Sequence, residues 1–363
     1  MYIFAIESSC DETSAAVIRA NDDKIEVLSN IIASQVDTHA LYGGVVPEIA
    51  SRAHCEVISS VSHEAIEKAG ISMSDIDAAA VTFAPGLIGP LLVGVNFVKA
   101  LAYRSGCKII PVQHIEGHLS AAYIENSSLK PPFLALAVSG GHTSLYKVEN
   151  YVDFDEIGST RDDACGEAFD KVGRVMGLPY PGGAAMDKLA SEAYTKFDYT
   201  KKDALTFPSP AVHDETYDFS FSGLKTAVIN HIHNEKQKAK AEDLPYETKC
   251  EIAGAFTNAV CSGITKKVSA ALKDTGMKTL VMAGGVAANS HLRRAVRDMC
   301  DSLGVEFVVP SLSLCGDNAA MIAARAYHMY RNKLFGDIEL DACASDDGAE
   351  EYLDRIKSLA RLG

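Results

Sequence analysis

The sequence lacks any apolar run of about eighteen residues or more, the length that spans a bilayer, so we expect no transmembrane segment and no membrane partner. Its first residues carry no basic region and lead directly into a strand pattern, so we expect no signal or transit peptide. No C-x-x-C pair occurs among its nine scattered cysteines. An odd number of cysteines without a pairing pattern favours a reduced, cytoplasmic compartment over a disulfide framework.

Basic charge is also in short supply. The chain has 34 Lys and Arg against 48 Asp and Glu, a net charge of −14, which argues against a broadly basic nucleic-acid binder. Residues 336–351 contain acids and no base, whereas basic residues gather at 236–240 and 293–297. Those clusters leave a local phosphate-binding face open, although solvated helix faces explain them as well. A length of 363 residues favours two lobes over one domain.

The most informative stretch is Gln113–His118. His114 and His118 are four positions apart, so on a helix both point from one face toward a single metal ion. Glu116 lies about 200° around the helix from each histidine and faces elsewhere. The stretch is therefore neither H-E-x-x-H nor H-x-x-E-H, the zinc peptidase motifs in which a neighbouring Glu acts as base. Two histidines under-coordinate a metal, so a third ligand, a carboxylate, is expected from elsewhere in the chain.

Two strand–turn–strand units stand out in the pattern. Residues 2–7 and 13–19 flank a polar turn, and residues 133–138 and 143–148 flank the turn at 139–142. We expect each hairpin to open one lobe, with both turns facing one cleft. Further strands are expected at 77–83, 107–112, 279–283 and 305–309, with helices at 47–69, 90–105, 224–240, 246–274, from 290, and at 318–331.

Three polar segments are candidates for ligand contact. Residues 158–190 combine carboxylates with a Pro-Gly-rich centre, which fits either a loop shaped around a ligand or an ordinary surface turn. The glycine pair after strand 279–283 precedes a helix and offers N–H groups to a phosphate or nucleoside, without matching a P-loop or a dinucleotide fingerprint. Asp317 stands directly before the last predicted helix, either as the third metal ligand or as the helix N-cap, which composition favours.

These features together describe the α/β, two-lobed, actin-like ATPase architecture (ASKHA, RNase H-like), with a ligand cleft between the lobes. Within it the sequence closely resembles the TsaD (Gcp/YgjD) family of tRNA N6-adenosine threonylcarbamoyltransferases, from Glu7 to about Arg325. The motifs that carry the resemblance are Glu7–Thr13, Gly43–Arg52, His114–His118, Val138–Thr143, Asp163–Lys171, Tyr180–Gly183, Phe219–Lys225 and Gly284–Asn289.

The resemblance implies an activity and a set of site residues. The family moves the threonylcarbamoyl group from threonylcarbamoyl-AMP to N6 of adenosine 37 in tRNAs that read codons beginning with A, and AMP leaves. One divalent metal, iron or zinc, would be held by His114, His118 and Asp317. The cleft would hold threonylcarbamoyl-AMP or ATP. Its lining would come from the main chain of Val138, Ser139, Gly140, Gly141 and His142, and its nucleotide contacts from Asp170, Gly183, Asp187 and Asn289.

Elementary chemistry fits this activity. An exocyclic adenine amine is a poor nucleophile, so it needs a metal or N–H groups that polarise the acyl carbonyl. The N–H groups of Ser139–Gly141 are candidate donors, and Asp11 or Glu12 is the candidate acceptor of the amine proton. Departures from the family pattern are Ala84 for Gly, Gly316 for Thr beside Asp317, and Val138 where some relatives have a ligating Tyr.

The resemblance also implies a domain division and partners. We expect a first lobe at 1–130, completed by a helix at about 318–335, a second lobe at 131–317 with an inserted substrate loop at 158–223, and an acidic tail with a terminal helix at 336–363. Expected partners are tRNA, a TsaB-like paralogue bound through first-lobe helices, a TsaE-like ATPase and a separate synthase of the adenylate. The competing classes are a metallopeptidase, a plain actin-like ATPase or sugar kinase, and a non-catalytic scaffold like TsaB.

Overall fold

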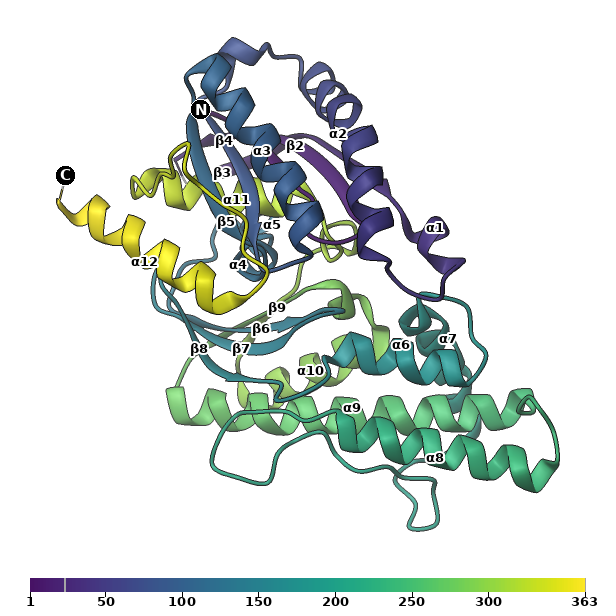
Figure 1. Cartoon of the computed structure of the whole chain (residues 1–363). Helices are drawn as coiled ribbons and strands as arrows, with labels where there is room; N and C mark the ends of the chain where they lie inside the picture. Colours follow the sequence, from purple (N-terminus) through teal and green to yellow (C-terminus); the bar gives the residue numbers. More distant parts are fainter. Residues whose placement is uncertain (23, 363) are drawn as a thin grey trace. The chain divides into compact units, whose positions relative to one another are not determined.

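Two five-stranded mixed sheets carry the fold, each in its own unit of the computed structural model, which describes residues 1–22 and 24–362 (Figure 1). Unit 1 comprises Met1–Pro131, Asn150–Asp153 and residues 310–362, and unit 2 comprises Pro132–Glu149 and Phe154–Val309. The lobe boundaries at 130 and 317 that we expected from the sequence stay a prediction.

The sheet of unit 1 has the order β3-β2-β1-β4-β5. β1 pairs antiparallel with β2 and parallel with β4, and β5 continues the parallel part. Every residue of β4 is buried, because α2 and α3 cover one face of the sheet and α11 the other (Figure 1). The bounds are β1 Tyr2–Glu7, β2 Glu12–Asn21, β3 Lys24–Ser34, β4 Ala78–Ala84, β5 Lys108–Gln113, α1 Val36–Ala40, α2 Pro47–Ala69, α3 Ile88–Ser105, α4 His114–Ser120, α5 Ala122–Glu125, α11 Ala319–Arg331 and α12 Asp346–Leu362.

The sheet of unit 2 has the order β10-β9-β6-β7-β8 and repeats the same arrangement of a hairpin beside parallel strands. The long helix α9 packs against α7 and α10, and α6 packs between α7 and α8. The bounds are β6 Phe133–Val138, β7 Thr143–Val148, β8 Phe154–Ser159, β9 Thr279–Ala283, β10 Glu306–Val308, α6 Cys165–Val175, α7 Gly182–Lys196, α8 Ser222–Ala239, α9 Tyr246–Thr275 and α10 Ser290–Leu303.

Local signals placed most of these elements correctly. Pro47 begins α2, and Gly70, with φ of 67°, ends it in the left-handed conformation. The second hairpin has the predicted bounds, whereas the edge strand β3 was not predicted. Residues 158–223 include α6 and α7, and no helix or strand occupies 197–221. At the start of α11 the N-cap is Asn318, whose side chain accepts the N–H of Met321, so the cap role proposed for Asp317 is wrong.

The acidic C-terminal segment is part of unit 1. Gly336 bridges Ile109 of β5, and the ring of Tyr352 on α12 lies 5.4 Å from that of Phe83 on β4. None of the helices in residues 1–22 and 24–362 is long and apolar enough to cross a membrane. The same residues contain no disulfide bond.

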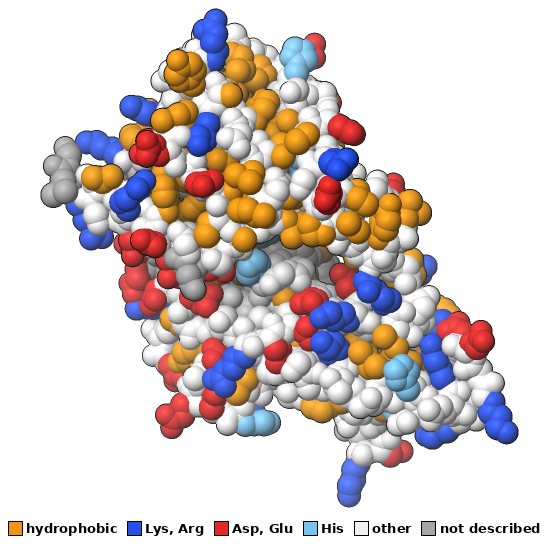
Figure 2. Space-filling model, in the orientation of Figure 1, with side chains coloured by type: hydrophobic (Ala, Val, Ile, Leu, Met, Phe, Trp, Pro, Cys, Tyr) orange, Lys and Arg blue, Asp and Glu red, His pale blue; other side chains and the backbone are white. Residues whose placement is uncertain are grey.

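One face of unit 1 exposes many apolar side chains, seen over α2 and α3 in Figure 2. Leu41 and Tyr103 are 84% and 86% exposed, and Tyr42, Ile88 and Leu92 are exposed nearby in sequence. Isolated exposed apolar residues are normal in soluble proteins, but a contiguous group of them is typical of an interaction surface.

Candidate metal centre and ligand pocket

The two histidines of α4 are brought together at its first turn. Strand β5 runs directly into α4, and the side chain of Gln113 caps the helix by accepting the N–H of Glu116 at 2.7 Å. His114 and His118 are both buried, with ring centroids 4.7 Å apart. The prediction that both histidines share one face of a helix is confirmed.

Asp317 completes the group from the turn that precedes α11. Its Oδ1 lies 3.1 Å from Nε2 of His118 and 3.6 Å from Nε2 of His114. The three ligand atoms all lie within 4.8 Å of one another, although Asp317 is 199 positions from His118 in the chain. Two imidazole nitrogens and one carboxylate oxygen are a donor set that suits iron or zinc.

Behind His114 stands a carboxylate that sequence reasoning missed. Oε2 of the fully buried Glu7 lies 3.0 Å from Nδ1 of His114 and accepts the hydroxyl of Thr82 at 2.6 Å, while Oε1 accepts the N–H of Ser9 at 2.6 Å. A proton on Nδ1 held in this way leaves Nε2 as the nitrogen that faces Asp317, and Nε2 carries a free lone pair when the imidazole is neutral. The only signal in the sequence is an acidic residue at the end of the apolar strand β1.

The charges around the centre also suit a cation. Burial alone would lower the pKa of His114, but the carboxylates of Glu7 and Asp317 raise it to about 9. Burial tends to raise the pKa of Glu7, yet the His114 imidazolium holds it below its usual value. Burial, Asp317 and Asp11 raise the pKa of Glu12 to about 9. The protein thus crowds carboxylates at a point where a divalent ion would neutralise them, and the residues fit a metal.

The candidate proton acceptors lie in the turn between β1 and β2. Asp11 is 8% exposed, and its carbonyl accepts the N–H of Gln35 at 2.9 Å. Glu12 begins β2 and accepts the hydroxyl of Ser34 at 3.0 Å. Both are in unit 1, as are the three ligands, and the charge of Asp317 contributes to the raised pKa of Glu12.

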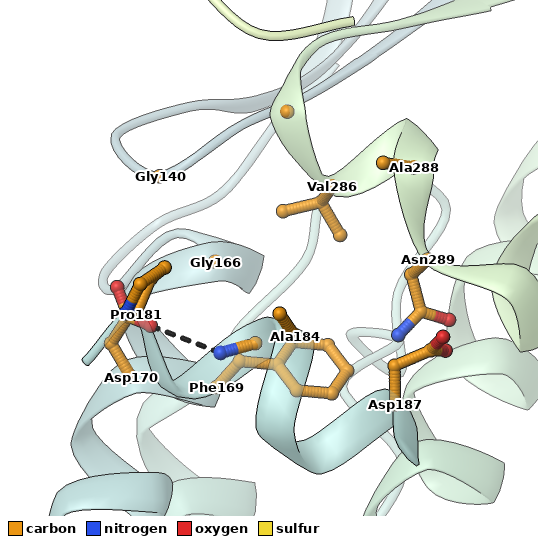
Figure 3. A pocket seen from close by; sticks show the side chains of 12 residues that line it. Gly140, Gly166, Phe169, Asp170, Pro181, Ala184, Asp187, Val286, Ala288 and Asn289 are labelled. Carbon is orange, nitrogen blue, oxygen red and sulfur yellow. Dashed lines mark hydrogen bonds between the residues drawn. The ribbon is translucent and has the colours of Figure 1, made fainter. Parts of the chain in front are cut away.

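Unit 2 has its own pocket, a cavity of about 410 Å³ (Figure 3). Its walls are apolar at Phe169, Pro181 and Val286, and its polar side chains are Asp170, Asp187 and Asn289. Of the residues expected to bind substrate, the cavity brings together Gly140, Asp170, Gly183, Asp187 and Asn289. Within the described chain, Val138, Ser139, Gly141 and His142 do not line it.

Hydrogen bonds fix the polar side chains of this pocket. Oδ1 of Asp170 accepts the N–H of Gly183, which lies at the start of α7, at 3.2 Å. Asp187 accepts the N–H and the hydroxyl of Ser290 at 3.0 and 3.1 Å. Asn289 caps α10 through its Oδ1, which leaves its amide nitrogen on the pocket side (Figure 3). Two helix N-termini, those of α7 and α10, therefore open at the cavity.

Two hydrogen bonds within the turn at 139–142 join its first and last residues. The N–H of Ser139 donates to the carbonyl of His142 at 2.8 Å, and the N–H of His142 donates to the hydroxyl of Ser139 at 3.1 Å. This corrects the expectation that the N–H of Ser139 serves as an oxyanion donor. The N–H groups of Gly140 and Gly141 have no acceptor among the described residues. Gly284 packs against the backbone of Val138, directly before this turn. Its φ is 100°, and a Cβ at this position would lie 2.3 Å from the carbonyl oxygen of Val138.

Solved structures of low sequence identity share this fold. Full-length HypF in a phosphate- and nucleotide-bound form is 14% identical, with a TM-score of 0.59 over 91% of this chain. HypF from T. kodakarensis is 13% identical, with a TM-score of 0.61 over 91% of this chain. This chain spans 46% and 48% of those two proteins. The two repeated mixed sheets and these neighbours define an actin-like α/β protein of the ASKHA class.

Sequence relatives identify the family within that class. The model of the TsaD family, tRNA N6-adenosine threonylcarbamoyltransferase, matches residues 26–324. A relative of that name from Geotalea uraniireducens is 49% identical over 94% of this chain and 95% of its own length, and one from Clostridium beijerinckii is 48% identical over 94% and 96%. The chain belongs to the TsaD family, and its reaction is threonylcarbamoyl transfer that forms N6-threonylcarbamoyladenosine in tRNA.

Proposed function

We propose that the chain transfers the threonylcarbamoyl group from threonylcarbamoyl-AMP to N6 of adenosine 37 in tRNAs that read codons beginning with A, with AMP as the leaving group. The observation that carries the mechanism is the convergence of His114, His118 and Asp317, with Glu7 behind His114. A metallopeptidase needs a Glu beside such histidines as a base, and here Glu116 is held by Arg325 on the other side of α4.

The residues of unit 1 would hold the metal and accept the proton. A divalent cation, iron or zinc, supplies Lewis-acid polarisation of the acyl carbonyl or neutralises the leaving phosphate. Glu7 keeps a proton on Nδ1 of His114, so that its Nε2 stays available as a ligand. Asp11 or Glu12 takes the proton of the amine. With a pKa near 9, Glu12 holds its proton at pH 7 in the absence of a cation.

The pocket of unit 2 would hold the nucleotide part of the adenylate. A cavity of about 410 Å³ is within the usual range for ligand pockets, and its apolar wall at Phe169 and Val286 suits a base. The carboxylates of Asp170 and Asp187 suit ribose hydroxyls, and the N-terminus of α7 at Gly183 suits a phosphate. Gly140 and Gly141 would present N–H groups to the acyl phosphate, with Val138, Ser139 and His142 shaping their turn.

The partners follow from the reaction and from the surface of unit 1. The chain needs tRNA and a separate synthase that supplies threonylcarbamoyl-AMP, and a TsaE-like ATPase completes the set in the cytoplasm. A TsaB-like paralogue would bind the apolar face over α2 and α3, where Leu92 and Tyr103 are exposed. Replacing both with Glu should abolish paralogue binding in size-exclusion chromatography while the circular dichroism spectrum stays unchanged. Retained binding would move the interface elsewhere.

The decisive experiment is nucleoside analysis of tRNA incubated with threonine, bicarbonate, ATP, the synthase and the partner proteins. Wild type should form threonylcarbamoyladenosine, and His114→Ala should form almost none. An adenosine-37-to-guanosine tRNA is the matched substrate control, and it should remain unmodified. Equal product from wild type and His114→Ala would refute the catalytic role of the metal centre, and product on the control tRNA would refute the proposed position.

A further inference from the structure

The middle residue of the histidine stretch has a partner of its own. Glu116 points away from both histidines and meets Arg325, in the middle of α11. Nε of Arg325 lies 2.8 Å from Oε2 of Glu116, and Nη2 lies 2.6 Å from the same oxygen. Arg325 is 1% exposed and Glu116 is 9% exposed. Neither residue has a role in the proposed transfer, so this buried ion pair calls for another explanation.

The guanidinium of Arg325 is fully engaged. Besides its bonds to Glu116, it donates through Nη1 to the carbonyl of Tyr151 and through Nη2 to the carbonyl of Val152, the latter at 3.2 Å. All of these residues belong to unit 1. An arginine whose three nitrogens each have an acceptor has one orientation, because its planar fork fits only that set of partners.

The pair joins α4, which carries the two histidines, to α11, which directly follows the turn that carries Asp317. Glu116 lies on α4 between the two histidines, and Arg325 lies roughly 9 Å along α11 from its first residue, Ala319, which follows Asp317 by two positions. The helices are in close contact at the same level, because a Cβ on Gly117 would lie 2.6 Å from Cδ1 of Ile322. The position of α4 against α11 therefore sets the distance from the histidines to Asp317.

The orientation of the His118 ring depends on the packing of α4 against α11 more than the orientation of the His114 ring does. The ring of His114 is fixed by Glu7, whereas Nδ1 of His118 is buried and has no hydrogen-bond partner among the described residues. A ligating histidine usually has an outer partner that fixes its orientation. For His118, the position of α4 as a whole must therefore fix the orientation of the ring.

We propose that Glu116 and Arg325 are a positioning pair, which holds α4 against α11 so that His118 and Asp317 meet at the metal. The proposal rests on the proposed metal centre. Neither side chain contacts the metal or the substrate, and Lys is no substitute for Arg325, because an ammonium cannot hold one carboxylate and two carbonyls in a fixed plane.

The test measures metal affinity rather than transfer. Full-length chain stripped of metal is titrated with Co²⁺ against a chromophoric chelator, and the visible absorption of bound Co²⁺ reports its coordination geometry. We expect wild type to bind one Co²⁺. Glu116→Gln and Arg325→Met should each bind about 10- to 100-fold more weakly, with altered absorption, as for other outer partners of ligands. The double variant should bind about as weakly as either single one, because the two residues act as a unit.

Arg331→Met is the matched control. Arg331 is on the same helix, six positions beyond Arg325, and donates to the hydroxyl of Tyr327 at 2.9 Å and to the carbonyl of Asp22 at 3.4 Å. It should bind Co²⁺ within about twofold of wild type, since distant sites act independently. Arg325→Lys retains a buried cation and covers the case in which Arg325→Met does not fold, and it should also lose about tenfold in affinity.

Two results would overturn the proposal, and they differ in what they reject. Variants that are folded by circular dichroism and bind Co²⁺ with the affinity and spectrum of wild type would reduce the pair to a structural contact. A wild-type chain that binds no Co²⁺, or binds it equally after His118→Ala, would reject the metal centre on which the proposal rests.

Discussion

Metal binding at neutral pH should release a proton from His114. In the metal-free chain the carboxylates of Glu7 and Asp317 hold the pKa of this histidine at about 9, despite its burial. A metal binds only the neutral imidazole, so the proton must leave. Two pH units below its pKa, about 1% of the histidine is neutral, which weakens metal binding about 100-fold at pH 7 relative to pH above 9.

Calorimetry can count that proton. Zn²⁺ is titrated into the metal-free chain at pH 7 in two buffers with different ionisation enthalpies, and the difference in apparent heat gives the number of protons released. We expect about one proton from His114. Because Glu12 also has a raised pKa beside Asp317, the titration is repeated with Glu12→Gln, which removes any contribution of that carboxyl.

Glu7→Gln is the informative perturbation. Gln keeps the size of the side chain but removes the charge that raises the pKa of His114, so proton release at pH 7 should fall well below that of wild type. The raised pKa of His114 also affects the stability of the metal-free protein. A histidine that binds its proton more tightly in the folded state than in the unfolded state contributes its full stabilisation below the unfolded-state pKa of about 6.5. That stabilisation, about 3 kcal/mol, is lost as the pH rises from 6.5 to 9. Metal affinity that does not change between pH 6 and 9, without proton release, would falsify the charged state of His114.

Three further predictions concern unit 2. Asn289→Ala should cost about 1 kcal/mol of unfolding free energy through the lost cap of α10, measured in urea, and should weaken AMP binding by calorimetry. Gly284→Ala should cost more than about 1 kcal/mol, since a Cβ would meet the carbonyl of Val138 and φ is 100°, and AMP binding should be lost with it. Asp162→Ala should lower the melting temperature, because Asp162 accepts two N–H groups at the start of α8, while AMP affinity stays unchanged. Unchanged stability in any of the three would contradict its structural role.

Elements with local signals could be predicted, and elements held by distant contacts could not. Pro47 and Gly70 mark the ends of α2 in the sequence itself, and strict apolar runs mark the second hairpin. The edge strand β3 buries only part of its residues in an irregular pattern, so no alternation revealed it. Sequence could not decide between cap and ligand for Asp317, because the neighbouring Asn318 is as good a cap and takes that role.

The candidate site likewise has features that the sequence could predict and features that it could not. The spacing of His114 and His118 is a local property, and it was sufficient to predict that both side chains lie on one face of a helix. The partners of these residues have no such signature. Glu7 lies 107 positions from His114, and Arg325 lies 209 positions from Glu116, so only folding reveals that they meet. Charged residues within otherwise apolar segments are the one hint that sequence offers for such pairs.

His328 should make unit 1 sensitive to acid. Its ring stacks on Tyr151 at 4.5 Å and lies 4.6 Å from Tyr123, and its Nε2 is buried without a hydrogen-bond partner among the described residues. Burial, together with the positive charges of Arg325 and Arg331, lowers the pKa of His328 to about 3. Protonation therefore favours the unfolded chain, in which the histidine has an ordinary pKa near 6.5.

The sign and size of the effect follow from linkage. The contribution of His328 is complete above pH 6.5 and is lost as the pH falls from 6.5 toward 3, so at pH 5 the free energy of unfolding should be about 2 kcal/mol lower than at pH 7.5. His328→Phe keeps an aromatic ring for stacking and removes the proton site, so its urea midpoint should fall less between pH 7.5 and 5 than that of wild type. The exposed His63, replaced by Gln, serves as control and should leave the wild-type difference unchanged. Equal losses in wild type and His328→Phe would show that other groups, among them the carboxylates that pair with basic residues, dominate the acid response.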